Sequence, residues 1–245
     1  MAGFVLIHGS WHGGWCFNEV AARLRNAGHF VVAPDLPGMG GTEAELRAVT
    51  LEGWAEFAAE QCRELKRHFA GPVVLAGHSR GGIVVLAAAE HDPLAMDALV
   101  YICAHMLPPG MSRAQFGEEH AVPNPGFAAI IQPLAAGAGS VVDRASAPGV
   151  FAQLSPPDLA GAAAARLVAE PSGPRSTSVV TTPERWGSLP RTYVECSEDR
   201  TIPVADQRLQ QRMSPGAQIV TLAADHSPFL SRPDELVEAL IGAIP

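Results

Sequence analysis

The strongest chemical signal in the chain is a serine placed between glycines. Residues 77–81 read Gly-His-Ser-Arg-Gly and fit the pattern G-x-S-x-G, with Ser79 at its centre. An apolar run at 73–76 precedes the pattern, and a helical stretch from about residue 80 to 90 follows it. A serine in a tight turn between a strand and a helix is exposed as a nucleophile, and the helix N-terminus favours developing negative charge. The pattern therefore predicts nucleophilic catalysis by Ser79.

A serine nucleophile needs a base and an acid that orients it. Asp199 follows an apolar run that ends at Cys196, and His226 follows another that ends at Leu222. A neutral imidazole can take the serine proton, and a carboxylate can fix its tautomer and stabilise the imidazolium. The chain order Ser79, Asp199, His226 is typical of a nucleophile elbow. Glu198 stays open as an alternative acid.

Acyl transfer also needs N–H donors for the oxyanion. The backbone N–H of Arg80 follows the nucleophile and is the first candidate. The glycine-rich loop at 8–15 follows the first apolar run, and its Ser10 N–H is the second candidate. A phosphate-binding loop is the alternative interpretation of this stretch, but it has neither a Walker lysine nor GxGxxG spacing.

The elements that would position these residues alternate between strand and helix. Their strands are apolar on both faces, which is typical of a parallel sheet covered by helices on both sides. The predicted strands are 4–7, 29–33, 73–76, 98–102, 192–196 and 218–222, and the predicted helices are 15–27, 50–69, 80–90, about 203–213 and a closing helix from Pro233.

The alternation breaks in the middle of the chain. Residues 105–190 hold 12 of the 21 prolines, with short helical stretches such as 157–169. The stretch at 159–168 is too apolar for a free linker. We therefore expect an α/β core formed by 1–104 and 188–245, with an inserted cap at 105–187.

Composition excludes several classes of protein. The 245 residues are 47% hydrophobic and carry a net charge of −8, from 17 Lys+Arg against 25 Asp+Glu. The hydrophobic content argues against disorder, and the negative net charge argues against nucleic acid as a partner. No apolar run reaches the roughly 18 residues of a membrane span, and the N-terminus lacks a basic segment, so we expect a cytoplasmic protein without a membrane partner. A homodimer stays open.

Cofactor chemistry finds no support in the residue spacing. The four cysteines are far apart and form no CxxC pair, so they are expected to be free thiols packed in the core. No local spacing of histidines and carboxylates indicates a metal site. We expect neither a cofactor nor a metal.

The sequence resembles the α/β-hydrolase superfamily, and within it the branch of plant methyl esterases, salicylate-binding methyl esterase, hydroxynitrile lyases and bacterial esterases. The resemblance implies a triad of Ser79, Asp199 and His226, with oxyanion donors at Ser10 and Arg80. It rests on FVLIHGSWHGGWCF at 4–17, AGHFVV at 27–32, APDLPG at 33–38, AGHSRGG at 76–82, LSPPDLA at 154–160, YVECSEDRTIP at 193–203 and DHSPFLSRP at 225–233.

Two positions bear on the reaction that the resemblance implies. The plant hydroxynitrile lyases carry Thr or Asn where this chain has Gly9, and one group of them carries Lys where this chain has Ser227. Both differences favour hydrolysis of a small carboxylic ester through an acyl-enzyme. A hydroxynitrile-lyase-like or other carbon–carbon lyase, a thioesterase and a non-enzymatic ligand receptor are the alternatives.

The substrate pocket is predicted from the loop and the cap. Arg80 has two interpretations: a structural ion pair with a nearby carboxylate, or an anchor for an acidic group on the substrate. The candidate pocket residues are Gly9, Trp11, His12, His105, Phe116, Phe151, Leu154 and Trp186.

Overall fold

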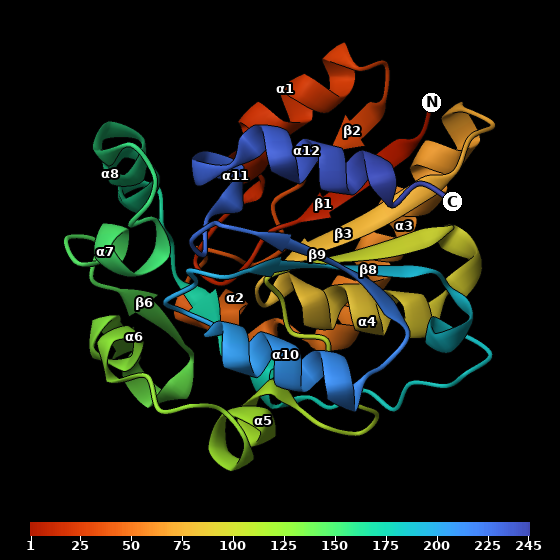
Figure 1. The fold of residues 1–245 in the computed structure, drawn as a ribbon. Coiled ribbons are helices and arrows are strands. Elements are labelled where there is room, and N and C mark those ends of the chain that lie inside the picture. The colour runs from red at the N-terminus through yellow and green to blue at the C-terminus, as the bar shows by residue number, and fades with distance from the viewer.

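The core of the protein is a six-stranded parallel sheet. The computed structural model describes residues 1–135 and 137–245. Its strands lie in the order β2-β1-β3-β4-β8-β9 (Figure 1), and every neighbouring pair is parallel. The strands are β1 (Gly3–Ile7), β2 (Phe30–Val32), β3 (Val73–His78), β4 (Ala98–Ile102), β8 (Arg191–Cys196) and β9 (Ala217–Leu222).

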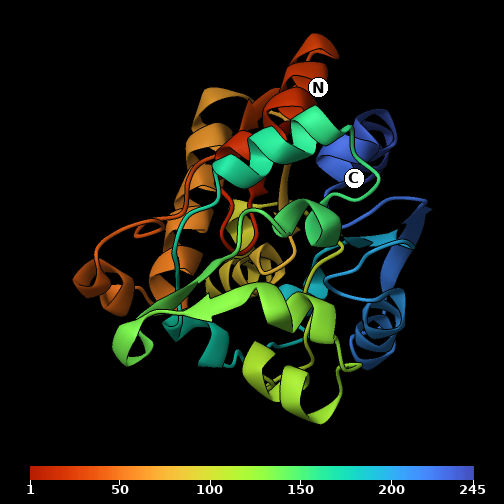
Figure 2. The ribbon, with the colours of Figure 1, turned by 90° about the vertical axis from the view of Figure 1, so that its left-hand side faces the viewer.

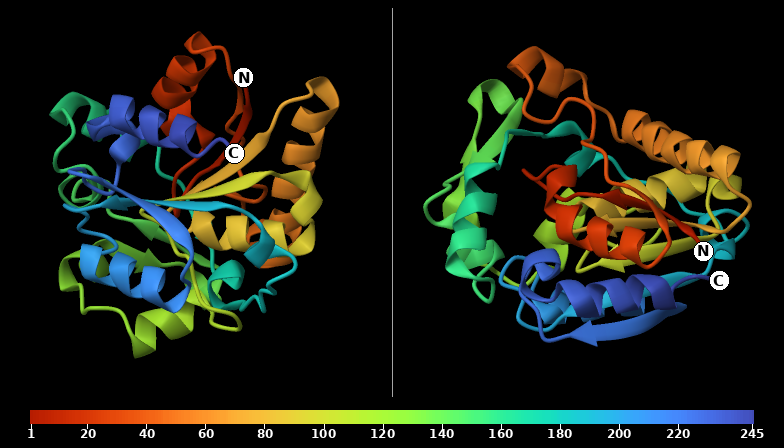
Figure 3. Two further views of the ribbon diagram at one scale, coloured as in Figure 1. Left: turned by 45° about the vertical axis from the view of Figure 1, so that its right-hand side comes forward. Right: turned by 90° about the horizontal axis from the view of Figure 1, so that it is seen from above.

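Helices cover both faces of this sheet, as the apolar strands predict (Figures 1 and 3). One face packs against α1 (Asn18–Asn26), α11 (Pro228–Ser231) and α12 (Pro233–Gly242). The other face packs against α3 (Leu51–His68), α4 (Gly81–His91) and α10 (Val204–Met213). The resulting three-layer α/β architecture confirms the predicted fold class.

Local chemistry sets the boundaries of the flanking helices. The Thr50 side chain accepts a hydrogen bond of 3.0 Å from the N–H of Gly53 and so caps α3, which ends in a basic turn. Helix α4 is buried almost all around, which matches its place under the centre of the sheet. The predicted helix at 15–27 begins instead with the 3-10 turn η1 (Gly14–Phe17).

The segment between β4 and β8 folds over the carboxyl ends of the strands (Figure 2). It carries a small antiparallel sheet in the order β5-β6-β7 and a separate apolar cluster built around Phe151, Ile130 and Leu167. Its elements are α5 (Arg113–Glu119), α6 (Pro125–Ile130), β5 (Ile131–Pro133), β6 (Gly139–Val142), α7 (Ala147–Phe151), α8 (Pro157–Ala165), β7 (Glu170–Pro171) and α9 (Gly173–Ser176).

The predicted helix at 157–169 is too long. Helix α8 ends at Ala165, and the next residues run extended into β7. The N–H of Val168 donates to the carbonyl of Trp11 at 2.8 Å, so this stretch is tied to the loop after β1. Residues 166–169, which the apolar pattern assigned to the helix, lie outside it because this tertiary hydrogen bond outweighs their helical preference.

Among the described residues, no helix is long and apolar enough to cross a membrane. All four cysteines are buried free thiols, as expected from their spacing.

Candidate active site

Ser79 lies in a strained turn between β3 and α4. Its φ is +53°, in the left-handed region that non-glycine residues rarely adopt. A Cβ on Gly77 would lie 2.5 Å from the carbonyl oxygen of Gly81, so only glycine fits before the turn. The N–H of Ser79 donates to Ile102 O at 3.1 Å, and Ser79 O accepts from the N–H of His105 at 3.0 Å. The end of β4 thus holds the backbone of the turn.

Asp199 and His226 meet beyond the ends of β8 and β9. His226 Nδ1 lies 2.7 Å from Asp199 Oδ2, and both residues are buried. Asp199 Oδ1 accepts the N–H groups of Thr201 and Ile202 at 2.7 and 2.9 Å. These donors replace the water that the buried carboxylate loses, and they fix which oxygen faces the imidazole.

Glu198, the alternative acid, is exposed and is not brought to His226. Its carboxylate accepts from Ser197 Oγ, and its carbonyl accepts from Gln153. Asp225 instead accepts from the N–H of Leu154 at 2.8 Å and so ties the His226 loop to the cap.

His78 connects the serine turn to the histidine loop. Its Nε2 donates to His226 O at 2.7 Å, and the two rings lie 4.7 Å apart. Within the described residues, Ser79 Oγ makes no hydrogen bond to His226. The local pattern around Ser79 gave no sign of this link.

The loop after β1 runs directly over Ser79. A Cβ on Gly9 would lie 2.8 Å from Ser79 Cβ and 2.9 Å from His78 Nδ1, so the loop and the nucleophile turn touch. In the part of the chain that the structure describes, the N–H groups of Ser10 and Arg80 donate to no protein acceptor. Two free backbone donors therefore flank the serine.

Two buried histidines shape this loop. Leu36 N–H donates to His8 Nε2 at 3.0 Å, so His8 Nδ1 carries the proton that it donates to Gly9 O at 2.9 Å. His12 Nδ1 donates to Ser10 O at 2.7 Å. Burial lowers the pKa of His8 to about 3 and that of His12 to about 4, so both are neutral at pH 7.

Aromatic side chains of the loop and the cap close over the site. The ring of Phe151 lies 5.9 Å from Trp11, 5.7 Å from His12 and 6.0 Å from His226. On the other side, Phe116 lies 6.3 Å from the ring of His105. With Gly9, six of the eight predicted pocket residues thus lie on the loop and cap elements that surround the candidates Ser79 and His226.

Two predicted pocket residues lie elsewhere. Trp186 packs in the main core, where its Nε1 donates to Tyr101 Oη at 2.8 Å and its N–H approaches Glu90 at the end of α4. It does not line the site, because the 3-10 turn η4 (Trp186–Ser188) returns the chain to the core before β8. The Leu154 side chain is 43% exposed, and only its backbone reaches the His226 loop.

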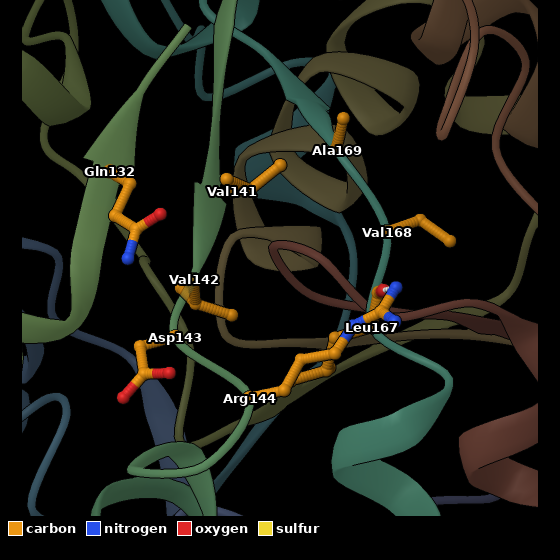
Figure 4. Close-up of a pocket in the computed structure, with 8 residues that line it drawn as sticks. All are labelled: Gln132, Val141, Val142, Asp143, Arg144, Leu167, Val168 and Ala169. Carbon is orange, nitrogen blue, oxygen red and sulfur yellow. Dashed lines mark hydrogen bonds between the residues drawn. The ribbon is translucent and has the colours of Figure 1, made fainter.

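One cavity of the cap lies away from the serine. Its volume is about 360 Å³, and it opens between β5, β6 and the extended stretch before β7 (Figure 4). A much smaller space of about 10 Å³ lies beside the site, lined by His12, Phe151 and Ser227 with alanines of α7 and α8. The cap therefore packs tightly over the candidate site.

One group of potential metal ligands occurs within the described residues. Ligand atoms of His78, Cys103 and His226 lie within 4.8 Å of one another. Asp199 already engages His226 Nδ1, and burial raises the pKa of the Cys103 thiol, which disfavours the thiolate that a metal binds. The donor set therefore fits a hydrogen-bonded catalytic site better than a metal centre.

Comparisons with known proteins lead to one family. The family model described as "Alpha/beta hydrolase family" matches residues 4–239. A pyrethroid hydrolase from Sphingobium wenxiniae is 31% identical, with 96% of this chain and 85% of that protein covered. A carbendazim hydrolyzing esterase from Nocardioides is 30% identical, with 98% of each chain covered.

Two solved structures superpose on nearly the whole chain. The crystal structure of a pyrethroid hydrolase from Sphingobium faniae superposes with a TM-score of 0.83 at 29% identity, covering 99% of this chain and 97% of that one. The structure of polyneuridine aldehyde esterase has a TM-score of 0.84 at 23% identity, which shows the shared fold.

Replacing Gly9 by alanine tests the contact between the loop and the nucleophile turn. The new Cβ would overlap Ser79 Cβ and His78, so we expect Gly9→Ala to lower the free energy of unfolding by about 1–3 kcal/mol. Gly242→Ala is the control, because nothing lies within 4 Å of a Cβ at Gly242. Urea unfolding at pH 7.5 measures both variants, and an equally stable Gly9→Ala would contradict the contact.

The buried histidines predict a pH dependence of stability. The unfolded chain protonates His8 and His12 near pH 6.5, whereas the folded protein keeps them neutral down to about pH 3 and 4. Below pH 6.5 the unfolded state therefore binds more protons, and each histidine lowers stability by about 1.4 kcal/mol per pH unit. Urea unfolding between pH 7.5 and 5 should show this fall, and His12→Asn should reduce its slope. A constant free energy of unfolding over this range would refute the buried neutral state.

Proposed function

The chain belongs to the α/β-hydrolase family and is an esterase-type enzyme, and from this premise we propose that it cleaves small carboxylic esters through an acyl-enzyme on Ser79. In this proposal His226 is the general base, and Asp199 orients it. The backbone N–H groups of Ser10 and Arg80 stabilise the oxyanion. The observation that carries the proposal is the buried contact of 2.7 Å between His226 Nδ1 and Asp199.

Acylation begins when Ser79 Oγ attacks the ester carbonyl carbon and His226 Nε2 takes the hydroxyl proton. In this proposal the tetrahedral oxyanion accepts hydrogen bonds from the two free N–H groups, which stabilise its negative charge. Collapse of the intermediate breaks the bond to the alcohol, and His226 gives its proton to the leaving oxygen. Water then attacks the acyl-enzyme with His226 as base, which releases the carboxylic acid and restores Ser79.

The environment of Asp199 supports its role in this sequence. Two backbone N–H groups hold one carboxylate oxygen, and the other faces the imidazole. A carboxylate held in this way keeps the proton on Nδ1, so Nε2 is free to accept from the serine. The hydrogen bond between Ser79 and His226 is expected to form when substrate binds, because such contacts are often loose in unliganded enzymes.

The contact at Gly9 favours hydrolysis over cyanohydrin cleavage. A Cβ at this position meets Ser79 Cβ at 2.8 Å, so a Thr or Asn side chain, as in the plant lyases, has no place here without movement of the loop.

Oxygen esters and thioesters share the same acylation chemistry. Their relative rates decide between carboxylesterase and thioesterase activity.

The plant and bacterial relatives narrow the substrate class in this proposal. Curated relatives include a methyl jasmonate esterase from Vitis vinifera and the two bacterial hydrolases described above. Small-molecule carboxylic esters, with methyl esters among them, are therefore the first class of substrate to test.

Replacing the nucleophile tests the mechanism directly. Ser79→Ala should lower kcat for p-nitrophenyl acetate by at least about 10³-fold, and Asp199→Asn should also lower it by a large factor, because each removes part of one catalytic unit. Glu198→Gln is the matched control and should retain wild-type turnover, since Glu198 is exposed.

Steady-state kinetics with p-nitrophenyl acetate and its thioester analogue measure all three variants. Full activity in Ser79→Ala would refute the mechanism. A larger loss in Glu198→Gln than in Asp199→Asn would assign the acid to Glu198.

A further inference from the structure

An unbalanced group of charges lies on the α3 side of Ser79, beneath the cap. Arg80 follows the nucleophile, Arg113 begins α5 and Arg175 lies on α9, while Glu170 is the carboxylate among them. Burial lowers the pKa values of Arg80 and Arg113, the negative charge of Glu170 opposes this lowering at both, and the positive charge of Arg175 adds to it at Arg113. Arg175 is exposed to solvent, so the charges removed from water are Arg80, Arg113 and Glu170, and two guanidinium groups against one carboxylate leave one positive charge.

Arg80 is buried and incompletely satisfied. Its Nε lies 3.1 Å from Glu170 Oε2, and its Nη2 donates to Gly9 O at 3.1 Å. The guanidinium also stacks 4.3 Å from the ring centre of Trp54. The contact with Glu170 is close but poorly aligned, because Nε, Nη1 and Glu170 Oε2 make no hydrogen bond. The structural ion pair therefore exists, but it uses only part of the capacity of either partner.

Arg113 connects the same charges to the serine. Its Nε donates to His105 Nε2 at 3.1 Å, and the backbone N–H of His105 donates to Ser79 O. Burial lowers the pKa of His105 well below its usual value, which keeps its ring neutral and able to accept from Arg113. In the described part of the chain, Nη1 and Nη2 of Arg113 have no acceptor. Arg113 is only half-buried and these two atoms reach solvent, so both are open to a ligand.

This arrangement favours an anion. A positive charge that is removed from water is costly unless it is fully paired. Burial accordingly lowers the pKa of Arg80 to about 10 and the pKa of Arg113 below its usual value. A carboxylate fits the paired donors of a guanidinium and would offset the excess charge. Neutral acyl chains offer nothing to these donors.

We infer that the preferred substrate carries a free carboxylate at the end of its acyl chain, bound by Arg113 in the positive field of Arg80, so that the enzyme cleaves half-esters of dicarboxylic acids. The inference rests on the proposed function, because the same Ser79 attacks the ester end of the molecule. Arg113 determines specificity in this account. Arg80 and Glu170 fix the charge and shape of the pocket beneath it.

Two p-nitrophenyl esters with the same leaving group and equal chain length test the inference. One is the half-ester of glutaric acid, and the other is the ester of pentanoic acid. Wild-type kcat/KM for the half-ester should be at least about tenfold higher, equal to about 1.4 kcal/mol. Arg113→Gln should remove this preference, mainly through a higher KM for the half-ester.

Arg212→Gln is the matched control. Arg212 is exposed at the end of α10, so this change removes one positive charge without touching the site, and the tenfold preference should remain. Competition in the wild-type enzyme gives a second measurement that needs no variant: glutarate should inhibit pentanoate hydrolysis at a concentration at least about tenfold lower than free pentanoate does.

Equal or faster wild-type cleavage of the pentanoate ester would overturn the inference, and so would an unchanged preference in a folded Arg113→Gln variant or equal inhibition by the two free acids. In each of these cases the neutral ester is still hydrolysed, and the proposed function stands. If wild type cleaves neither ester, the proposed function itself fails.

Discussion

The hydrogen bond between His226 and Asp199 is the interaction on which the site depends. It can form only if a carboxylate is buried beside an imidazole without losing its negative charge. The turn after β8 meets this requirement with the N–H groups of Thr201 and Ile202, and Gln207 of α10 approaches the second oxygen at 3.3 Å. Gln207 also bonds both the N–H and the carbonyl of Cys196, which fixes this turn to the end of β8.

The parallel sheet brings the partners together because its strands end at one edge. β3, β4, β8 and β9 are neighbours in the sheet, so the turns that carry Ser79, Cys103, Asp199 and His226 meet beneath the cap. Hydrogen bonds then fix their relative positions. The side chain of His78 donates to the carbonyl of His226, and the backbone N–H of His105 donates to the carbonyl of Ser79. Ser79 keeps its strained φ because its backbone donates a hydrogen bond to Ile102 and accepts one from His105. Strained backbone of this kind is common at functional sites.

Local sequence patterns predicted much of this structure. The apolar runs and their glycine stops predicted the parallel sheet and its helices, and the G-x-S-x-G pattern lies at the strand-to-helix turn where it was expected. The candidates Asp199 and His226 were predicted from their places after strands, and they lie in contact. These features depend on short stretches of chain, where residue type and spacing carry the information.

Long-range contacts could not be predicted in the same way. Glu170 contacts Arg80, and Arg113 contacts His105, only because the cap folds back, and nothing in the local sequence marks either residue. Trp186 was assigned to the pocket because it lies in the proline-rich segment, but a hydrogen bond to Tyr101 draws it into the core. The helix predicted at 157–169 is shortened by the hydrogen bond of Val168 to Trp11 for the same reason.

We propose that Ser79 is the nucleophile and that His226 activates it. Covalent labelling of the serine tests this role. Wild-type enzyme treated with a serine-reactive fluorophosphonate should carry one adduct, which peptide mass spectrometry should locate on Ser79. His226→Ala should be labelled far more slowly at the same residue. An adduct on a different serine, or an enzyme that still turns over esters after full incubation with the reagent and carries no adduct, would contradict the account.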